Sequence, residues 1–357
     1  MIVTYVYASV LTDQVRTQVR CRNMVDAINR TGTHRAHLLD MVSFVQNTEG
    51  AQKICGASDL LVIYRYLYGP VLTAVQYWKA RDKKVIVDFD QAFNYLTESM
   101  PSYSFWFEGK PLNGLDIENA IRIDPPPIEQ FKWGLAMVDA ATVPSLRLVD
   151  DWSRFTRVHK VMDYINTSHY PAAYQADGDE IWIGPGIGVN RDCLERSGLL
   201  AALENVLRIR PQVKLILAGM EMQEVSAAFH VNSEQIKVCS PNCFEDWVDI
   251  LLHLNIGLKP IFGDYDLRLG SYDLLEFMIS KIPWIASEEP TFQIMSQYGQ
   301  WVPNKPQAWE HAILSMIEEL DAHQRRAGRE SFLFALNQDL SVNIARILRV
   351  YDAILGS

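Results

Sequence analysis

The sequence is short of positive charge and of cysteine. Lysine and arginine number 33 against 43 acidic residues, which gives a net charge of −10 at pH 7. Proteins whose main partner is nucleic acid carry clustered basic residues, so this balance argues against that class and leaves room for a local basic pocket. The five cysteines are scattered and odd in number. They predict reduced thiols and a cytoplasmic location rather than a disulfide framework.

Long apolar runs and leader-like segments are also lacking. No stretch approaches the roughly 20 apolar residues that cross a bilayer. Residues 1–12 (MIVTYVYASVLT) are apolar but have neither a basic leader nor a cleavage site, so we expect a first β-strand here rather than a signal peptide. Cys239 and Cys243 are four residues apart, and no second pair completes a zinc site.

Several catalytic signatures are missing as well. The turn after the first expected strand, residues 7–18 (YASVLTDQVRTQ), has no glycines, which disfavours an NAD-dependent enzyme because the dinucleotide fingerprint GxGxxG would follow that strand. The eight histidines form no cluster along the sequence. No Ser-His-Asp or Cys-His arrangement of a nucleophile stands out.

What the sequence does contain is a regular alternation of strand-like and helix-like stretches. The expected strands are residues 2–7, 36–39, 59–64, 84–88, 141–143 and 160–165, and then 181–183, 213–218, 236–239, 255–259 and 284–286. The main expected helices are residues 13–30, 70–80 and 128–138, and then 199–207, 244–254, 272–279, 306–320 and 342–355. Such alternation is typical of parallel sheets covered by helices on both faces.

The alternation occurs in two series, which predicts an α/β chain of two Rossmann-like domains facing a cleft. The first domain is expected at residues 1–166, with an aromatic and proline-rich insertion at 91–127. A polar linker follows at 167–179 (TSHYPAAYQADGD), and the second domain at 180–340. The C-terminal helix, within residues 341–357, follows a completed second domain, and we expect it to pack back across the junction.

Four segments, in this order and spacing, resemble the GT-B glycosyltransferases, in particular the retaining, family-4-like group that uses nucleotide sugars. These segments are KKVIVDFDQAFNYL (83–96), MVDAATVPSLRLVDDW (137–152), IWIGPGIG with NRDCLERSGLLAALENVLRIRPQVKLILAG (181–219), and NIGLKPIFGDYDLRLGSYDLLEFMISKIPWIAS (255–287). The resemblance is dense over the second domain and patchy over the first. It implies that the second domain binds a UDP- or GDP-sugar and the first domain an acceptor.

The resemblance gives a role to the acidic residue in the apolar stretch SYDLLEFMIS (271–280). In the family, the carboxylate that matches Glu276 accepts hydrogen bonds from both ribose hydroxyls of the nucleotide. The alternative is a surface glutamate on an amphipathic helix. Gly270, Ser271 and Tyr272 precede and begin this helix, so its free backbone N–H groups could hold the diphosphate. Capping of a tight turn explains the Gly-Ser pair equally well.

Diphosphate binding without a metal requires cations, because negative charge builds on the leaving phosphate. Lys259, at the end of the expected strand NIGLK, and Arg191 and Arg196, on the first loop and helix of the second domain, are the candidates. For Arg196 an exposed helix face is an equally good interpretation. Gly186, in the GPGIG loop, gives room for close backbone approach.

The family often has a second acidic residue eight positions before the ribose-binding glutamate, where it contacts the transferred sugar. Here that position is Arg268. Asp264 and Asp266 are the candidates to replace it, and we choose Asp266 as the third catalytic residue beside Lys259 and Arg191.

Asp88 and Asp90 form an Asp-x-Asp triplet after the fourth strand of the first series, as Asp264 and Asp266 do in the second. Two carboxylates are too few for a divalent cation that takes six or more oxygens, so we expect no metal and no cofactor. Asp88 and Asp90, with Arg65 after the third strand, are instead expected at the acceptor site. Phe105-Trp106-Phe107 in the insertion is either an acceptor platform or a mini-core that anchors the loop.

The sequence therefore predicts a glycosyltransferase that moves a sugar from a nucleotide sugar to a hydroxyl of a glycan, lipid or small molecule. Retention of configuration is implied by the resemblance alone. In that mechanism the departing phosphate helps to deprotonate the acceptor, which suits a chain without an evident catalytic histidine. Two alternatives stay open: a nucleotide-sugar epimerase, which shares the fold, and a non-catalytic GT-B-like protein that binds a nucleotide or a partner.

Overall fold

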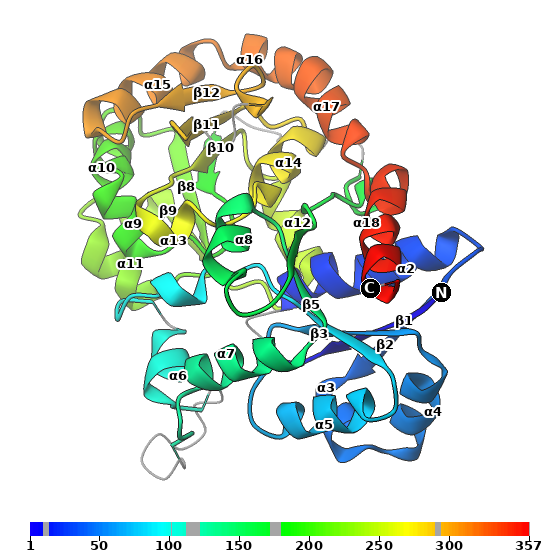
Figure 1. The fold of residues 1–357 in the computed structure, drawn as a ribbon. Coiled ribbons are helices and arrows are strands. Elements are labelled where there is room, and N and C mark those ends of the chain that lie inside the picture. The colour runs from blue at the N-terminus through cyan, green and yellow to red at the C-terminus, as the bar shows by residue number, and fades with distance from the viewer. Residues whose placement is uncertain (10–13, 101, 112–121, 172–179, 290–293, 357) are drawn as a thin grey trace. The chain divides into compact units, whose positions relative to one another are not determined.

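The computed structural model describes residues 1–9, 14–100, 102–111, 122–171, 180–289 and 294–356 (Figure 1). The chain divides into two compact units. The first comprises Met1–Asp163, Arg268–Gly270 and Leu340–Ser357, and the second comprises Tyr164–Leu267 and Ser271–Asp339. Each unit is an α/β structure built on one parallel sheet of six strands.

The sheet of the first unit has the strand order β2-β1-β3-β4-β5-β6. Its strands are β1 (Ile2–Tyr7), β2 (Arg35–Asp40), β3 (Leu60–Tyr64), β4 (Lys84–Asp88), β5 (Ala140–Val143) and β6 (Val158–Lys160). Every residue of β3 is buried, as expected for a central parallel strand that helices cover on both faces. The expected sixth strand at 160–165 is shifted, because the pairing with β5 runs from Val158 to Lys160.

The described helices of the first unit connect successive strands, apart from the C-terminal helix, which follows all of them. They are α1 (Gln14–Thr17), α2 (Asn23–Arg30), α3 (Met41–Gln46), α4 (Glu49–Ala57), α5 (Pro70–Lys79), α6 (Tyr103–Glu108), α7 (Pro127–Met137), α8 (Leu146–Trp152) and the C-terminal α18 (Leu340–Leu355). A π-helical turn, Gln18–Arg22, joins α1 to α2. The C-terminal helix α18 packs on α2, and the hydroxyls of Tyr351 and Tyr5 lie 2.6 Å apart.

The insertion contributes to an aromatic cluster inside the first unit. Phe105 and Trp106 are each 2% exposed. The ring centroid of Trp106 lies 4.0 Å from that of Phe93 and 5.7 Å from that of Phe131. These contacts agree with the mini-core interpretation of Phe105 and Trp106. Residues 112–121 of the insertion lie outside the described residues.

The sheet of the second unit has the order β12-β11-β10-β7-β8-β9. Its strands are β7 (Ile181–Pro185), β8 (Val213–Ala218), β9 (Ile236–Cys239), β10 (Ile256–Lys259), β11 (Trp284–Ser287) and β12 (Gln300–Val302). The strand β12 was not expected from the sequence, because three residues, one of them glutamine, carry too short a pattern.

The helices of the second unit are α9 (Arg191–Arg196), α10 (Leu199–Ile209), α11 (Met222–Ala228), α12 (Phe244–Leu251), α13 (Gly263–Asp266), α14 (Tyr272–Ile279), α15 (Pro306–Glu318), α16 (Leu320–Arg326) and α17 (Phe332–Asn337). Leucine, isoleucine and valine side chains from β7, β8 and β10 pack with α10 and α15 in one core. All eight residues of α14 are buried, as expected for a helix that is apolar on most of its surface.

Candidate functional site

The centre of the second sheet is a topological switch point. From β7 the chain moves to β8 on one side, and from β10 it moves to β11 on the other. Open parallel sheets bind ligands at the carboxyl ends of such strands, because the crossing connections diverge there. Lys259 ends β10 and Gly186 directly follows β7, and the two strands pair in parallel with Leu258 opposite Pro185. Two residues predicted for the site therefore lie at this switch point.

Lys259 does not stand alone at this edge. Its Nζ lies 2.5 Å from Oδ2 of Asp273, in the first turn of α14, and the two side chains are 14% and 7% exposed. Asp273 also packs against the loop after β7, since a Cβ added to Gly186 would lie 2.8 Å from Asp273 Oδ2. Lys259, Asp273 and Gly186 therefore form one tightly packed group, and glycine is required at 186 for this close approach.

One turn further along α14, Glu276 is 2% exposed. Its Oε1 accepts a hydrogen bond from the hydroxyl of Tyr170 at 2.8 Å and another from the indole Nε1 of Trp247, on α12, at 2.9 Å. The alternative interpretation of Glu276 as a solvated surface residue is therefore wrong. Helix α14 packs against β10 (Figure 1), and residues three apart share a helix face. Asp273 and Glu276 thus belong to the same face of α14.

The beginning of α14 offers backbone N–H groups. Ser271 occupies the N-cap, and its side chain makes no capping hydrogen bond; Tyr272 is 2% exposed. The first N–H groups of a helix have no intrahelical partner and carry partial positive charge, which favours an anion. Gly270 belongs to the first unit, where a Cβ at this position would clash with the carboxylate of Asp163.

Two other predicted residues of the second unit, Arg191 and Arg196, lie on α9. Arg191 pairs with Glu195 at 2.6 Å and Arg196 with Asp192 at 3.5 Å, with arginine side chains 42% and 56% exposed. The structure therefore places neither arginine in the buried group around Lys259, and Arg196 lies over the ring of Phe262 at 4.5 Å.

Asp266 has mainly local contacts. Its Oδ2 accepts the backbone N–H of Phe262 at 3.0 Å. Burial raises its pKa, although a hydrogen bond with the Cys193 thiol acts in the opposite direction. Burial likewise raises the pKa of Cys193, with the charge of Asp266 adding to the effect. The hydrogen bond from Phe262 shows that Asp266 fixes the start of α13, and the catalytic role of Asp266 stays a prediction.

In the first unit, the switch point lies between β1 and β3, and Arg65 directly follows β3. Arg65 adopts φ = 61°, a left-handed conformation that is uncommon for residues other than glycine. Its guanidinium forms a two-point ion pair with Asp90, at 2.7 and 3.0 Å. Burial raises the pKa of Asp90, but the charge and hydrogen bonds of Arg65 outweigh it and lower the pKa to about 2.

Asp88 is paired as well, with a residue that the sequence analysis missed. Arg20, in the π-helical turn, binds Asp88 through two nitrogens at 2.5 and 2.9 Å, and it reaches Asp163 at 2.8 Å. Thr142 donates a further hydrogen bond to Asp88. Burial raises the pKa of Asp163, and Arg20 acts against that rise. Arg65, Asp88 and Asp90 thus lie at one edge of the sheet, each buried in an ion pair, and their place at an acceptor site stays a prediction.

Arg268, the residue that departs from the family pattern, belongs to the first unit. Its Nε lies 2.5 Å from Oδ2 of Asp151, on α8, and its guanidinium carbon lies 3.5 Å from the ring centroid of Tyr95. Its backbone carbonyl accepts the hydroxyl of Ser145 at 2.6 Å. The positive charge at this position is therefore neutralised by Asp151, and Arg268 is held by both its side chain and its backbone.

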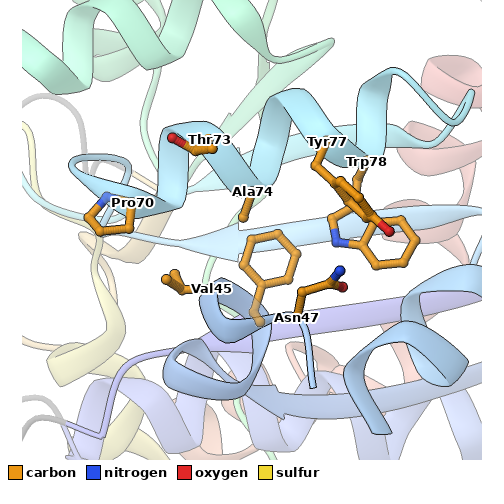
Figure 2. A pocket seen from close by; sticks show the side chains of 8 residues that line it. Val45, Asn47, Pro70, Thr73, Ala74, Tyr77 and Trp78 are labelled. Carbon is orange, nitrogen blue, oxygen red and sulfur yellow. The ribbon is translucent and has the colours of Figure 1, made fainter. Parts of the chain in front are cut away.

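A pocket of about 260 Å³ lies between α3 and α5 in the first unit (Figure 2). It is lined by Phe44, Val45, Asn47, Pro70, Thr73, Ala74, Tyr77 and Trp78. The lining contains no residue that the sequence analysis assigned to the site. Among the described residues, no group of three His, Cys, Asp or Glu side chains could hold a metal, and no helix is long and apolar enough to cross a membrane.

The residues that were not predicted for the site differ in whether the sequence carried a signal for them. Asp273 precedes Glu276 by three positions, so its place on the same helix face was readable from the spacing. Trp247 and Tyr170 come from segments 29 and 106 residues away from Glu276. No local pattern joins them to it.

Of the comparisons with known proteins, the one with solved structures bears on the architecture. No protein-family model and no curated protein sequence matches the chain. Among solved structures, the chain is similar to sucrose-phosphate synthase from Thermosynechococcus elongatus, with a TM-score of 0.64 and 14% identity over 99% of both chains.

Two further similar structures are a putative epimerase of a nucleotide sugar and a protein solved together with UDP. A putative UDP-N-acetylglucosamine 2-epimerase from Listeria monocytogenes has a TM-score of 0.55 and 11% identity, over 99% of this chain and 97% of that one. S. aureus MnaA, in a structure with UDP, has a TM-score of 0.54 and 10% identity, over 100% of this chain and 98% of that one. At these identities the similarity establishes architecture, and the chain resembles the GT-B glycosyltransferases in its fold of two Rossmann-like units.

Proposed function

We propose that the chain is an enzyme that transfers a sugar from a UDP- or GDP-sugar to an acceptor hydroxyl. The observation that carries the proposal is the convergence of two polar groups on one face of α14 at the switch point of the second sheet. These groups are Lys259 with Asp273, and Glu276 with Tyr170 and Trp247. A buried cation and a buried carboxylate one helical turn apart suit a diphosphate and a ribose, respectively.

In this proposal the nucleotide lies along the start of α14. Glu276 accepts hydrogen bonds from the ribose hydroxyls. Lys259 and the N–H groups near Ser271 and Tyr272 hold the diphosphate, and Gly186 leaves room for Asp273 beside Lys259. Preorganised donors of this kind stabilise the charge that develops on the leaving phosphate, so no metal is required. Arg191 is a second cation of the donor site, and it would have to leave Glu195 to act.

Retention of configuration is part of the proposal and is supported by the sequence resemblance. The departing phosphate then takes the proton of the acceptor hydroxyl, while the bond between the anomeric carbon and the phosphate oxygen breaks and the new glycosidic bond forms. The buried pairs Arg65–Asp90 and Arg20–Asp88 shape the proposed acceptor edge of the first unit. The cytoplasm is the compartment that we propose for this reaction.

A nucleotide-sugar epimerase is the second candidate. It is favoured by the similarity to a putative UDP-N-acetylglucosamine 2-epimerase over nearly the whole of both chains. Epimerisation and transfer would share the nucleotide subsite, so nucleotide binding alone does not separate them. The products do, because an epimerase converts a UDP-sugar into its epimer without any acceptor, whereas a transferase requires one or slowly hydrolyses the donor.

The test is a melting-curve screen against UDP, GDP, ADP and their sugars, followed by product analysis for the nucleotides that bind. A ligand that binds only the folded chain raises its melting temperature. We expect a UDP- or GDP-sugar to raise it, and NMR to show glycosyl transfer or donor hydrolysis. Formation of an epimer would replace the proposal with the second candidate. Absence of any nucleotide effect would favour a non-catalytic protein of the same fold.

A further inference from the structure

The hydrogen bonds to Glu276 converge on a single oxygen from two separate elements. Trp247 approaches from α12, and Tyr170 from the segment that follows the 3₁₀ turn Thr167–His169. The donor–acceptor distances to Oε1 are 2.9 and 2.8 Å. A glutamate side chain has three flexible torsions, and two donors on one oxygen restrict these torsions by holding that oxygen in place.

All three residues are withdrawn from solvent. Trp247 is 1% exposed, Tyr170 is 8% exposed and Glu276 is 2% exposed. A carboxylate at such a place costs free energy unless it is hydrogen-bonded, so the donors serve to keep it there. Burial raises the pKa of Tyr170 well above its ordinary value, and the charge of Glu276 adds to the effect. The phenol therefore keeps its proton at neutral pH and remains a donor.

The ring of Tyr170 has a packing role separate from that of its hydroxyl. It meets the ring of Phe244, the first residue of α12, edge to face with centroids 6.1 Å apart. Removing the hydroxyl alone therefore keeps the aromatic contact between the two segments. This separation lets a Tyr170→Phe variant report on the hydrogen bond without a large change in packing.

We propose that Trp247 and Tyr170 are positioning residues that hold Glu276 in the orientation that selects ribose over deoxyribose in the nucleotide. The inference rests on the proposed function. A carboxylate has about four acceptor positions, so it can hold protein donors and ribose hydroxyls at the same time. Selection against a missing hydroxyl requires an acceptor fixed at the right place, because a loose one would turn to another donor or to water.

The experiment measures, for the full chain, the dissociation constants of UDP and 2′-deoxy-UDP, or of GDP and its 2′-deoxy form if guanine is the base. Calorimetry is run on the wild type and on Trp247→Phe and Tyr170→Phe. Hydrogen bonds to a charged group predict that the wild type prefers the ribonucleotide about tenfold or more. We expect this preference to fall several-fold toward one in both variants. A purely packing role would weaken both ligands equally and leave the ratio unchanged.

Matched controls are available in the same unit. Trp301 donates through its indole to the carbonyl of Ser296, and the ring of Tyr298 packs at a tilt on that of Phe334 with centroids 4.6 Å apart. Trp301→Phe and Tyr298→Phe should keep the wild-type ratio. If Trp247→Phe does not fold, the ratio measured for Tyr170→Phe alone tests the positioning role, because this variant keeps the aromatic ring that packs on Phe244.

The possible failures are distinct. A wild type that binds nucleotide, with an unchanged ratio in Tyr170→Phe and in any folded Trp247→Phe, overturns the positioning role and leaves the proposed function standing. A wild type that binds no nucleoside diphosphate overturns the proposed function and this inference with it.

Discussion

The ammonium group of Lys259 lies 2.5 Å from the carboxylate of Asp273, and this pair joins the end of β10 to the first turn of α14. The lysine therefore has a fixed position before any ligand arrives. A preorganised cation stabilises developing charge without first having to be ordered. The same pair also makes Lys259 contribute to the stability of the fold. Its effect on turnover and its effect on stability can be measured separately.

We predict that Lys259→Ala lowers turnover by about two to three orders of magnitude, because one fixed donor to a developing phosphate charge is lost. It should also lower the free energy of unfolding by about 1–3 kcal/mol, since Asp273 loses its partner in a buried place. The double variant Lys259→Ala/Asp273→Asn should recover much of the stability and none of the turnover. Steady-state rates and melting curves of both variants check this.

Arg196→Ala is the comparison for Lys259. The Arg196 side chain is 56% exposed, and substitutions at such positions change stability by no more than about 0.5 kcal/mol. We expect little loss of turnover. If Arg196 is essential and Lys259 dispensable, the diphosphate lies at α9 and our placement is wrong.

Glu276→Gln should weaken nucleotide binding by about 1.5–3 kcal/mol, because the ribose hydroxyls would donate to a neutral amide instead of a carboxylate. The amide keeps an oxygen for Trp247 and Tyr170, so the fold should persist. Calorimetry with the nucleotide that binds best gives the affinity, and a melting curve gives the stability. Wild-type affinity in this variant would refute the ribose assignment.

The ion pair of Arg65 and Asp90 predicts a pH-dependent contribution to stability. The pKa of Asp90 is about 2 in the folded chain and about 3.9 in an unfolded one. A lowered folded-state pKa means that the contribution, about 2–3 kcal/mol, is complete above pH 4 and is lost as the pH falls from about 4 to 2. Asp90→Asn should therefore destabilise the chain most at neutral pH, and the deficit should shrink below pH 4. Urea unfolding at a series of pH values measures it, and a deficit independent of pH would contradict the assignment.

Arg20→Met should destabilise the first unit by about 3–5 kcal/mol, since it leaves Asp88 and Asp163 as buried carboxylates without their shared cation. Arg30→Met, at an exposed position of α2, is the control and should change stability by less than about 0.5 kcal/mol. Denaturant unfolding of the two variants gives the comparison. Similar values for both would show that the buried network adds little.

Activity should survive EDTA, because the proposed counter-charges for the diphosphate are Lys259 and backbone N–H groups. The assay is transfer or hydrolysis of the best donor before and after chelation. Complete loss that Mn²⁺ restores would shift the role to carboxylate ligands such as Asp88 and Asp90.

The architecture could be predicted from the sequence because short, mostly apolar runs alternate with helix-like stretches, which is the pattern of parallel sheets covered by helices. Residues 213–218 and 236–239 are strands with the predicted bounds. The strand β12 was not predicted, and β6 was predicted at shifted bounds. A strand of three residues is defined by its pairing with a neighbouring strand rather than by its own sequence pattern.

The site could be predicted only in part. The place of Lys259 at the end of a strand could be predicted from the residues, whereas the role predicted for Glu276 came from the family resemblance. The sequence did not suggest which residues pair with the buried charges. Arg20 occupies a helical segment where arginine is ordinarily exposed, and it is buried only because β4 and the chain after β6 supply Asp88 and Asp163. Such pairings arise from tertiary contacts between distant segments.

The membership of α18 in the first unit sets an order for synthesis. The hydroxyl of Tyr5 can form its hydrogen bond with that of Tyr351 only after α18 has left the ribosome. At about 5–20 residues per second, residues 164–339 take roughly 10 to 35 seconds to emerge after the first unit's main segment. During that interval, the surface of α2 that later contacts α18 is uncovered. A nascent chain of this protein therefore completes its first unit last, after the whole second unit has been made.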